Sequence, residues 1–177
     1  MGEVAIVKVG GSLFDLPALG PGLMRWVRSR PGRCRIVAGG GPAADVVRAY
    51  HHTHGLLETV SHWMAIRMMD VNGSLLKQFL GDAADVVNML PFCEEDEALP
   101  GALSHNWRVT SDSLAARVAE VQRADRLVLL KSVDLAEGIS WTEAAERGLV
   151  DHMFGEAVGR AGLRVEWINF RQWLAIG

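Results

Sequence analysis

Several features that mark specialised classes of protein are scarce or missing in this sequence of 177 residues. Its two cysteines, Cys34 and Cys93, lie far apart and form no CxxC pair, which argues against a disulfide framework and for a reducing compartment. No apolar run approaches the ~20 residues that a membrane span requires. The N-terminus also lacks a basic segment followed by a signal-peptide core. We therefore expect a cytoplasmic protein that does not enter a membrane.

Concentrated charge is missing as well. The net charge is −3 and the sequence contains no basic block, so nucleic-acid binding is not expected. Hydrophobic residues make up 49% and charged residues 22% of the chain, as is ordinary for a globular protein. No repeat, low-complexity segment or linker divides a chain of this length. We predict a single domain over residues 1–177.

Apolar runs alternate with amphipathic stretches along the chain. Runs typical of strands are at residues 4–9, 35–38, 85–90, 107–109, 126–130 and 164–168. Stretches typical of helices are at residues 23–27, 43–54, 58–80, 112–121, 142–147, 155–161 and 170–176. This alternation predicts an α/β fold, a three-layer αβα sandwich with a mostly parallel sheet and helices on both faces.

The longest predicted helix, residues 58–80, has apolar side chains at steps of three and four. This stripe consists of Val60, Met64, Met68, Val71, Leu75 and Phe79. Asn72, Gly73 and Ser74 interrupt it and predict a kink. The acidic stretch 94–97 predicts a solvated surface.

Four predicted strand or loop ends carry residues suited to anions. These are Lys8–Ser12 (KVGGS), Gly39–Pro42 (GGGP), Thr110–Asp112 (TSD) and Lys131–Asp134 (KSVD). Glycine turns present backbone N–H groups to an anion, and the lysines add positive charge. Because the carboxyl ends of parallel strands share one edge of a sheet, this edge can hold two phosphate-bearing groups end to end. The alternative for the first of these ends is a tight turn with a surface lysine.

Two other groups of residues are weaker candidates for metal binding. His51, His52 and His54 end a predicted helix, where the dipole favours imidazolium, and a metal site would need further ligands. Asp82 and Asp85 flank a loop, where aspartate more often forms turns than binds Mg²⁺. We predict no metal site built from protein side chains.

With these motifs, the chain resembles the amino acid kinase superfamily, which includes aspartate, acetylglutamate, uridylate and isopentenyl phosphate kinases. The matching stretches follow the family's order and are residues 8–12, 37–42, 110–116 and 124–134. The resemblance implies a sandwich with one half for ATP and Mg²⁺ and one half for the phosphate acceptor.

The resemblance also implies roles for particular residues. Lys8 would neutralise charge on the transferring phosphoryl group, and Asp112 would orient the catalytic lysines. The nucleotide-binding residues would be Gly10, Gly11, Ser12, Lys131, Ser132 and Asp134. The acceptor-binding residues would be Gly39, Gly40 and Gly41, with the long helix at 58–80 lining the pocket.

The chain departs from the family pattern in two places. Only residues 135–140 separate the KSVD stretch from the next helix, so the nucleotide-binding half is shortened. The stretch 148–153 lacks the second lysine that several family members carry near the start of a late helix. Lys131 can supply this charge from the third strand, and the alternative is that Lys131 is a solvated lysine beside the site.

The sequences of these motifs are most similar to those of a small branch of the family that is linked to methanofuran and tetrahydromethanopterin. In this branch an aminomethylfuran phosphate is converted to its diphosphate. The resemblance implies an ATP-dependent phosphotransferase that acts with Mg²⁺ on a small, phosphorylated acceptor. It also implies a homo-oligomer, for which Trp63 and the methionine-rich helix offer apolar surface. The alternative is a non-catalytic nucleotide- or anion-binding protein that keeps the kinase fold. The shortened adenine region and the missing late lysine favour this alternative.

Overall fold

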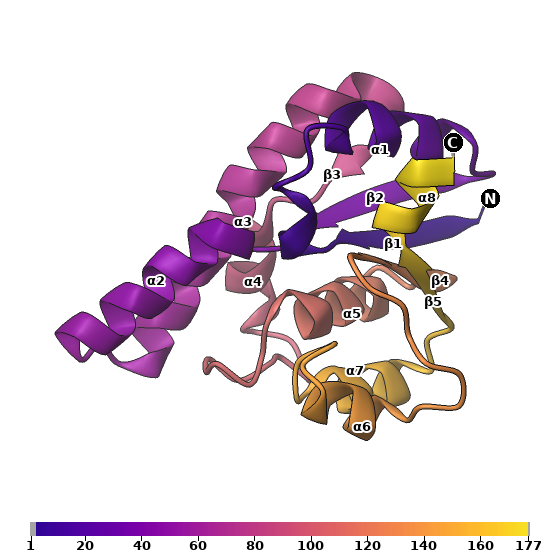
Figure 1. Ribbon diagram of the computed structural model, residues 1–177. Coiled ribbons are helices and arrows are strands. Elements are labelled where there is room, and N and C mark those ends of the chain that lie inside the picture. The colour runs from indigo at the N-terminus through magenta and orange to yellow at the C-terminus, as the bar shows by residue number, and fades with distance from the viewer. Residues whose placement is uncertain (1–2, 177) are drawn as a thin grey trace.

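The computed structural model describes residues 3–176, and at its centre lies a five-stranded sheet in the order β3-β2-β1-β4-β5 (Figure 1). The strands are β1 (Val4–Val9), β2 (Arg33–Ala38), β3 (Asp85–Val86), β4 (Arg126–Lys131) and β5 (Val165–Asn169). All four neighbouring pairs are parallel. Val9 is in register with Ala38 of β2 and Leu130 of β4, so the carboxyl ends of three central strands are level at one edge.

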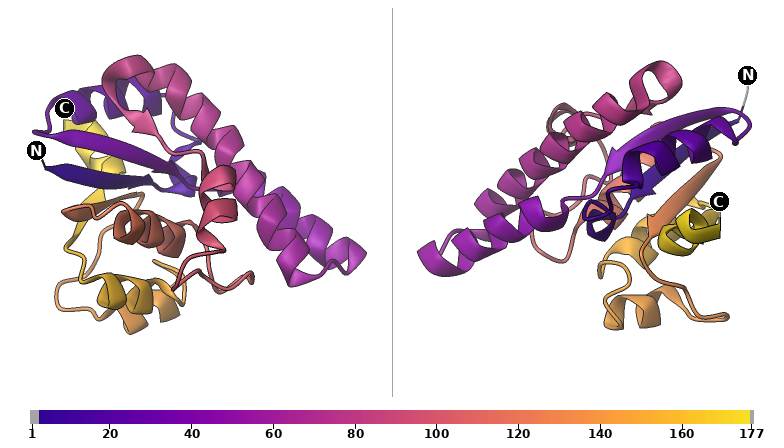
Figure 2. Two further views of the ribbon diagram at one scale, coloured as in Figure 1. Left: turned by 180° about the vertical axis from the view of Figure 1, so that it is seen from behind. Right: turned by 45° about the horizontal axis from the view of Figure 1, so that its top comes forward.

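Helices cover both faces of this sheet (Figures 1 and 2). They are α1 (Leu19–Arg28), α2 (Gly41–His54), α3 (Glu58–Leu80), α4 (Met89–Asp96), α5 (Ser111–Val121), α6 (Trp141–Glu146), α7 (Phe154–Ala161) and α8 (Phe170–Ile176), with short turns η1 (Gly11–Leu13) and η2 (Gly81–Ala83). Helices α1 and α8 and the end of α3 pack on one face, and α4, α5 and α7 pack on the other. The predicted three-layer αβα sandwich is confirmed. None of the helices in residues 3–176 is long and apolar enough to cross a membrane.

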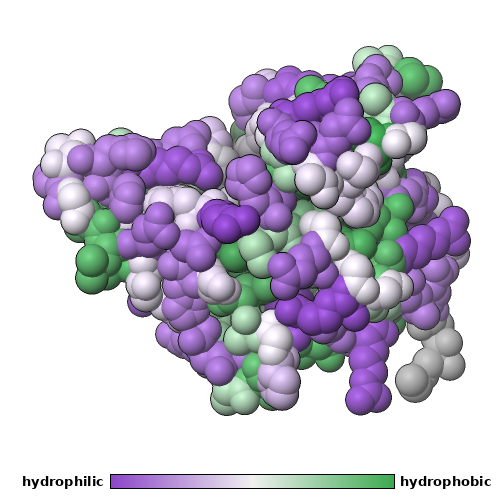
Figure 3. Space-filling model, turned by 90° about the horizontal axis from the view of Figure 1, so that it is seen from below, coloured by the Kyte–Doolittle hydropathy of each residue, from purple (hydrophilic) through white to green (hydrophobic). Residues whose placement is uncertain are grey.

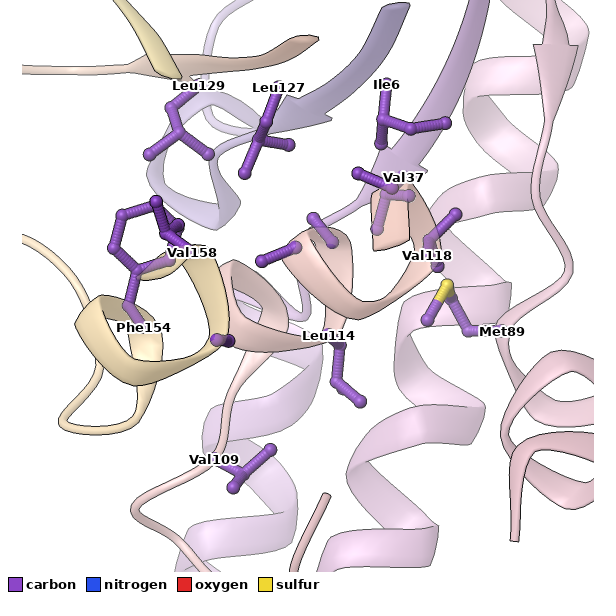
Figure 4. Packing of buried hydrophobic residues seen from close by; sticks show 14 of the residues in the cluster. Ile6, Val37, Met89, Val109, Leu114, Val118, Leu127, Leu129, Phe154 and Val158 are labelled. Atoms are coloured by element: carbon purple, nitrogen blue, oxygen red, sulfur yellow. The ribbon is translucent and has the colours of Figure 1, made fainter. Parts of the chain in front are cut away.

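Alternate residues of each central strand enter two hydrophobic cores. Ile6, Leu127 and Leu129 point toward α5 and α7, where Phe154 and Val158 meet them (Figure 4). The intervening residues of the strands join the core beneath α1 and α8. Because successive side chains of a strand point to opposite faces, a strand covered on both sides has an uninterrupted apolar sequence. This burial explains why β1 and β4 were recognisable as apolar runs.

Helices α2 and α3 form an antiparallel hairpin that projects beyond the sheet (Figure 2). Gly55 ends α2 in the left-handed conformation, with φ of +59°, which lets the chain reverse into α3. The projecting arm carries hydrophobic surface, visible in green on its side of Figure 3. Its exposed apolar side chains are Val46, Tyr50, Leu57 and Val60.

Helix α3 is continuous over Glu58–Leu80, and the kink predicted at residues 72–74 does not interrupt it. A Cβ at Gly73 would lie 3.6 Å from Val86 of β3, which is an ordinary contact. The predicted apolar stripe lies mostly outside the buried positions of the helix. Val71 and Leu75 are exposed, whereas the buried positions are Ser61, His62, Ile66, Met69, Gly73, Leu76 and Leu80. The buried face thus combines two small residues, Ser61 and Gly73, with larger apolar residues at Ile66, Met69, Leu76 and Leu80.

Two of the six predicted strands are corrected by the structure. The strand predicted at 85–90 has only the two residues of β3, because α4 begins at Met89. Pro91 lies in the first turn of α4, where no backbone N–H is needed. Residues 107–109 form no strand and belong to an irregular loop, although Val109 is buried.

The prediction of a solvated acidic stretch at 94–97 is wrong for Asp96. Its carboxylate is buried and lies 2.7 Å from Nη2 of Arg117 on α5, while Arg117 Nε donates to both of its oxygens. The guanidinium also donates to the backbone carbonyl of Pro100. This ion pair joins α4 to α5 and fixes the loop between them.

We predict that Asp96→Ala lowers the free energy of unfolding by about 3 kcal/mol, because it leaves the buried guanidinium of Arg117 without its main partner. Urea denaturation measures this loss. Glu95→Ala, an exposed neighbour on the same helix, serves as the control and should change stability by less than about 0.5 kcal/mol. Equal midpoints for the two variants would contradict the prediction.

Candidate functional site

Two lysines and one aspartate meet at the carboxyl edge of the sheet. Lys8 Nζ lies 2.8 Å from Oδ1 of Asp112, and Lys131 Nζ donates to Oδ2 of the same carboxylate at 2.8 Å. The three residues come from β1, β4 and the first turn of α5, and all are buried, with exposures of 3%, 8% and 5% for Lys8, Lys131 and Asp112. The structure thus brings together the three side chains that the sequence suggested as catalytic.

The protonation of this triad follows from burial and from mutual charge. Burial alone would raise the pKa of Asp112, but the charges of Lys8 and Lys131 outweigh it and hold the pKa below its usual value. Burial and the neighbouring charge of Lys8 lower the pKa of Lys131 to about 8, although Asp112 opposes the shift. Lys131 also donates to the carbonyl of Leu149 and lies over the ring of Trp167. Lys131 is therefore a buried member of the site and not a solvated edge lysine.

The start of α5 is anchored by Asp151, which the sequence analysis did not identify. Its Oδ2 accepts hydrogen bonds from the backbone N–H and the hydroxyl of Thr110 and from the N–H of Ser113, and its Oδ1 accepts from the Ser113 hydroxyl. Asp151 thereby provides the N-terminal cap of α5 from a distant loop. Asp112, between these capped residues, does not cap the helix and pairs with the two lysines.

The environment of Asp151 is itself unusual. Burial and the negative charge of Asp112 raise its pKa, although the hydrogen bonds from Ser113 and Thr110 act against the shift. The only sequence signal that could have drawn attention to Asp151 is its position in the stretch 148–153, where the lysine of several family members is missing. A carboxylate occupies this stretch and orders the helix that carries Asp112.

The two glycine turns pack against each other at this edge. A Cβ added to Gly11 would lie 2.5 Å from the backbone nitrogen of Gly41, and a Cβ at Gly39 would lie 2.7 Å from the nitrogen of Gly11. Gly41 also has a φ of +51°, a conformation that side chains disfavour. The amide of Asn72 donates to the carbonyls of Gly39 and Gly40 and so ties the second turn to α3. The glycines are thus required by the close approach of the two turns.

Not every predicted backbone donor faces outward. Gly10 N–H donates to the carbonyl of Leu130 at 2.8 Å, and Gly39 N–H donates to the carbonyl of Val9 at 2.9 Å. Both groups extend the hydrogen bonding of the sheet. An anion at this edge is therefore not held by these two N–H groups, contrary to the expectation for Gly10.

The structure also brings the predicted nucleotide-side residues near one another. The hydroxyls of Ser12 and Ser132 are hydrogen-bonded at 2.8 Å across the ends of β1 and β4. Arg171 of α8 donates to the carbonyl of Ser12 and to Asp15, which holds the first turn in place. Asp134 instead accepts a hydrogen bond from Gln172 at the surface. Residues 132–140 contain no strand or helix, as a shortened nucleotide half requires.

A cavity of about 180 Å³ opens on the other side of Lys8. Its inner end is formed by Lys8, Asp112 and the turn at Gly40 and Gly41. Its walls are formed by α2, α3 and the loop before α5, and they are mainly apolar. Lys131 does not line this cavity, so Lys8 and Asp112 separate it from the Ser12–Ser132 side.

The residues present suit an anionic ligand better than a bound metal. In residues 3–176 no group of three or more histidine, cysteine or carboxylate side chains is arranged to hold a metal ion. His51 instead contacts the Ser61 hydroxyl at 3.0 Å, and Asp85 pairs with Arg33.

Comparisons with known proteins agree with this architecture. No family model matches the chain. The chain is 26% identical over 142 residues to [5-(aminomethyl)furan-3-yl]methyl phosphate kinase of Methanocaldococcus jannaschii. This match covers 73% of the chain and 66% of the relative, which is just under two thirds of that protein's length.

Solved structures decide the fold. Uridylate kinase from Archaeoglobus fulgidus superposes with a TM-score of 0.63 at 19% identity, covering 94% of this chain and 90% of its own. Aspartate kinase from Synechocystis superposes with a TM-score of 0.64 at 14% identity, covering 93% of this chain and 37% of its own. The chain has the amino acid kinase fold. The fold that the resemblance implied is confirmed, and its sheet has five parallel strands in the described residues.

We predict that Gly11→Ala destabilises the protein by about 2 kcal/mol, because the new methyl group overlaps backbone atoms of Gly41 and neither turn can yield without moving its strand. Thermal unfolding measures the change. Gly159→Ala is the matched control: a Cβ at this exposed position in α7 meets nothing within 4 Å and should stabilise the helix by up to about 1 kcal/mol. A Gly11→Ala variant as stable as the wild type would show that the turns are not in tight contact.

Proposed function

We propose that this protein is an ATP-dependent kinase that phosphorylates a small acceptor which already carries a phosphate group. The observation that carries the proposal is the buried Lys8–Asp112–Lys131 triad, placed between the cavity and the Ser12–Ser132 turns. The relative from M. jannaschii makes [5-(aminomethyl)furan-3-yl]methyl phosphate the first acceptor to test.

The triad suits phosphoryl transfer because that reaction depends on positioning and charge neutralisation. An acceptor oxygen would form a bond to the γ-phosphorus of ATP while the bond to the β,γ-bridging oxygen breaks and ADP departs. Negative charge spreads over the oxygens of the transferring group at this point. Two ammonium groups that share one carboxylate provide a net positive charge, already oriented, where that group would lie.

The nucleotide would bind on the side of Ser12 and Ser132, and the acceptor in the cavity beyond Lys8. Mg²⁺ would neutralise the phosphates of ATP, which bring it into the site. Ser12, Ser132 and the first glycine turn are the chain's own groups on this side. With only residues 132–140 between β4 and α6, few protein contacts to the adenine ring are expected.

We also propose that the protein forms a homo-oligomer. The surface available for it is the exposed apolar stripe of α3, where Val60, Val71 and Leu75 have exposures of 42–57%. Val60 lies near the start of α3, where the helix forms part of the projecting arm (Figure 2), and Val71 and Leu75 lie on the exposed side of its second half.

We predict that Lys8→Met lowers kcat by at least about a hundredfold, because loss of a charge directed at the transferring group costs about 3 kcal/mol of transition-state stabilisation. ADP release with [5-(aminomethyl)furan-3-yl]methyl phosphate as acceptor measures the rate, and thermal unfolding verifies the fold. Lys77→Met, which removes an exposed lysine of α3, is the control and should keep the wild-type rate. A wild-type protein that binds ATP but turns over with no phosphorylated acceptor would favour the non-catalytic alternative.

A second prediction concerns pH. The rate should fall as pH rises through about 8, because Lys131 loses its proton there and with it the positive charge. Below this pH Lys131 is protonated, and its titration no longer limits the rate. Arginine stays protonated above pH 12, so Lys131→Arg should remove the alkaline decline even if its maximal rate is lower. An unchanged alkaline decline in Lys131→Arg would assign the titration to a different group.

A further inference from the structure

The cavity beyond Lys8 contains a second cation, Arg48, to which no role has been assigned. Gly41, Ala44 and Arg48 follow one another at steps of three and four along α2 and all line the cavity. On α3, which runs the other way, Met69, Ile66 and His62 form the facing wall. The cavity is therefore a trench between α2 and α3, about two helical turns or ~10 Å long, with Lys8 at one end and Arg48 toward the other.

The side chain of Arg48 is held by two neighbours. Its guanidinium carbon lies 4.9 Å from the ring centroid of Trp107, and Nη1 donates to Oδ1 of Asp45 at 2.7 Å. Side chains of a helix lean toward its N-terminus, and the contact with Asp45, one turn earlier, shows that Arg48 does so. The guanidinium is thus directed back along the trench toward the glycine turn.

Arg48 retains donors for a ligand. Within residues 3–176, its Nε and Nη2 form no hydrogen bond to the protein, and 45% of the side chain is exposed. A guanidinium presents its N–H groups in a planar fork that matches two oxygens of a phosphate. Stacking on Trp107 fixes the plane of this fork before a ligand arrives.

The charges of the cavity favour an anion near Arg48. Among the described lining residues, Lys8, Asp112, Arg48 and His62 are ionisable. Burial and the nearby His105 lower the pKa of His62 to about 4, so its imidazole is neutral at neutral pH. Lys8 is paired with Asp112, whereas Arg48 is paired only with Asp45, which lies outside the cavity lining. Because the Arg48–Asp45 pair is largely exposed to solvent, it is weak, and an anion in the cavity can still bind the guanidinium.

From this geometry we propose that Arg48 binds the phosphate which the acceptor already carries, and that it makes the site selective for phosphomonoesters over the corresponding alcohols. The inference rests on the proposed function and names the residue that selects its substrate class. The acceptor phosphate would lie between Lys8 and the guanidinium. The organic part would contact the apolar walls at Ala44, Ile66 and Met69.

Calorimetric titration without nucleotide tests this selectivity. The two probes are [5-(aminomethyl)furan-3-yl]methyl phosphate and the alcohol that lacks its phosphate. Arg48→Met should weaken binding of the phosphate ester ten- to a hundredfold and leave binding of the alcohol unchanged, and Arg48→Lys should lose less because it keeps the charge. Arg67→Met, which removes an exposed arginine of α3 outside the cavity, is the matched control and should bind both compounds as the wild type does.

Equal weakening for the ester and the alcohol would overturn the proposal, because Arg48 would then only shape the cavity. Unchanged binding of the ester would also overturn it. Melting temperatures of the ligand-free variants show whether the fold is kept.

If the wild type binds neither compound, the aminomethylfuran acceptor of the proposed function is wrong, and inorganic phosphate tests Arg48 separately. Phosphate should raise the melting temperature of the wild type and of Arg67→Met, but not of Arg48→Met. Equal protection of Arg48→Met, or no protection of the wild type, would overturn the assignment of a phosphate site to Arg48.

Discussion

The site depends on one carboxylate that is shared by two buried ammonium groups. Burying Lys8 or Lys131 alone would be strongly unfavourable, and Asp112 makes both burials possible by pairing one oxygen with each lysine. This requirement brings β1, β4 and α5 to a common point at the edge of the sheet. The triad has a net positive charge in a low-dielectric environment. An anion that bound beside it would lower the electrostatic energy of this charge. The same interaction therefore constrains the fold and supplies the positive charge that the proposed function requires.

The surrounding structure serves to keep that carboxylate in place. Asp151 caps α5 and so sets the direction of Asp112, while the interlocked turns at Gly11 and Gly41 set the spacing between β1 and α2. On the opposite side, Arg171 holds the turn that contains Ser12. Each of these supports comes from an element that does not itself carry the lysines. The position of the triad is therefore determined from several directions, as a site that depends on charge placement requires.

Much of this arrangement could be predicted because strand ends in a parallel sheet must share an edge. That rule brings together Lys8 and Lys131, which stand in β1 and β4, whereas the place of Asp112 beside them was implied by the resemblance to the kinase family. Asp151 could not be predicted, because a capping residue from another part of the chain leaves no periodic pattern. The buried face of α3 could not be read from its apolar residues alone, because the helix has apolar side chains both on the buried face, at Ile66, Met69 and Leu76, and at the surface, at Val71 and Leu75. Asp96 was predicted to be solvated because it lies among other acidic residues, and nothing in the sequence indicates that it pairs with Arg117 in the interior.

The cap on α5 has a consequence for how the protein forms during synthesis. Ser12 and Ser132 are hydrogen-bonded although they are 120 positions apart in the sequence. Thr110 likewise donates to Asp151, which lies 41 positions later. Contacts between such distant segments form slowly, since a long loop must close before they contribute. A nascent chain that has emerged only as far as β4 contains both lysines and Asp112 but lacks the carboxylate that fixes the start of α5. The edge of the sheet that carries Lys8, Asp112 and Lys131 is therefore expected to be completed only in the last stages of folding, after α2 and α3 have already paired.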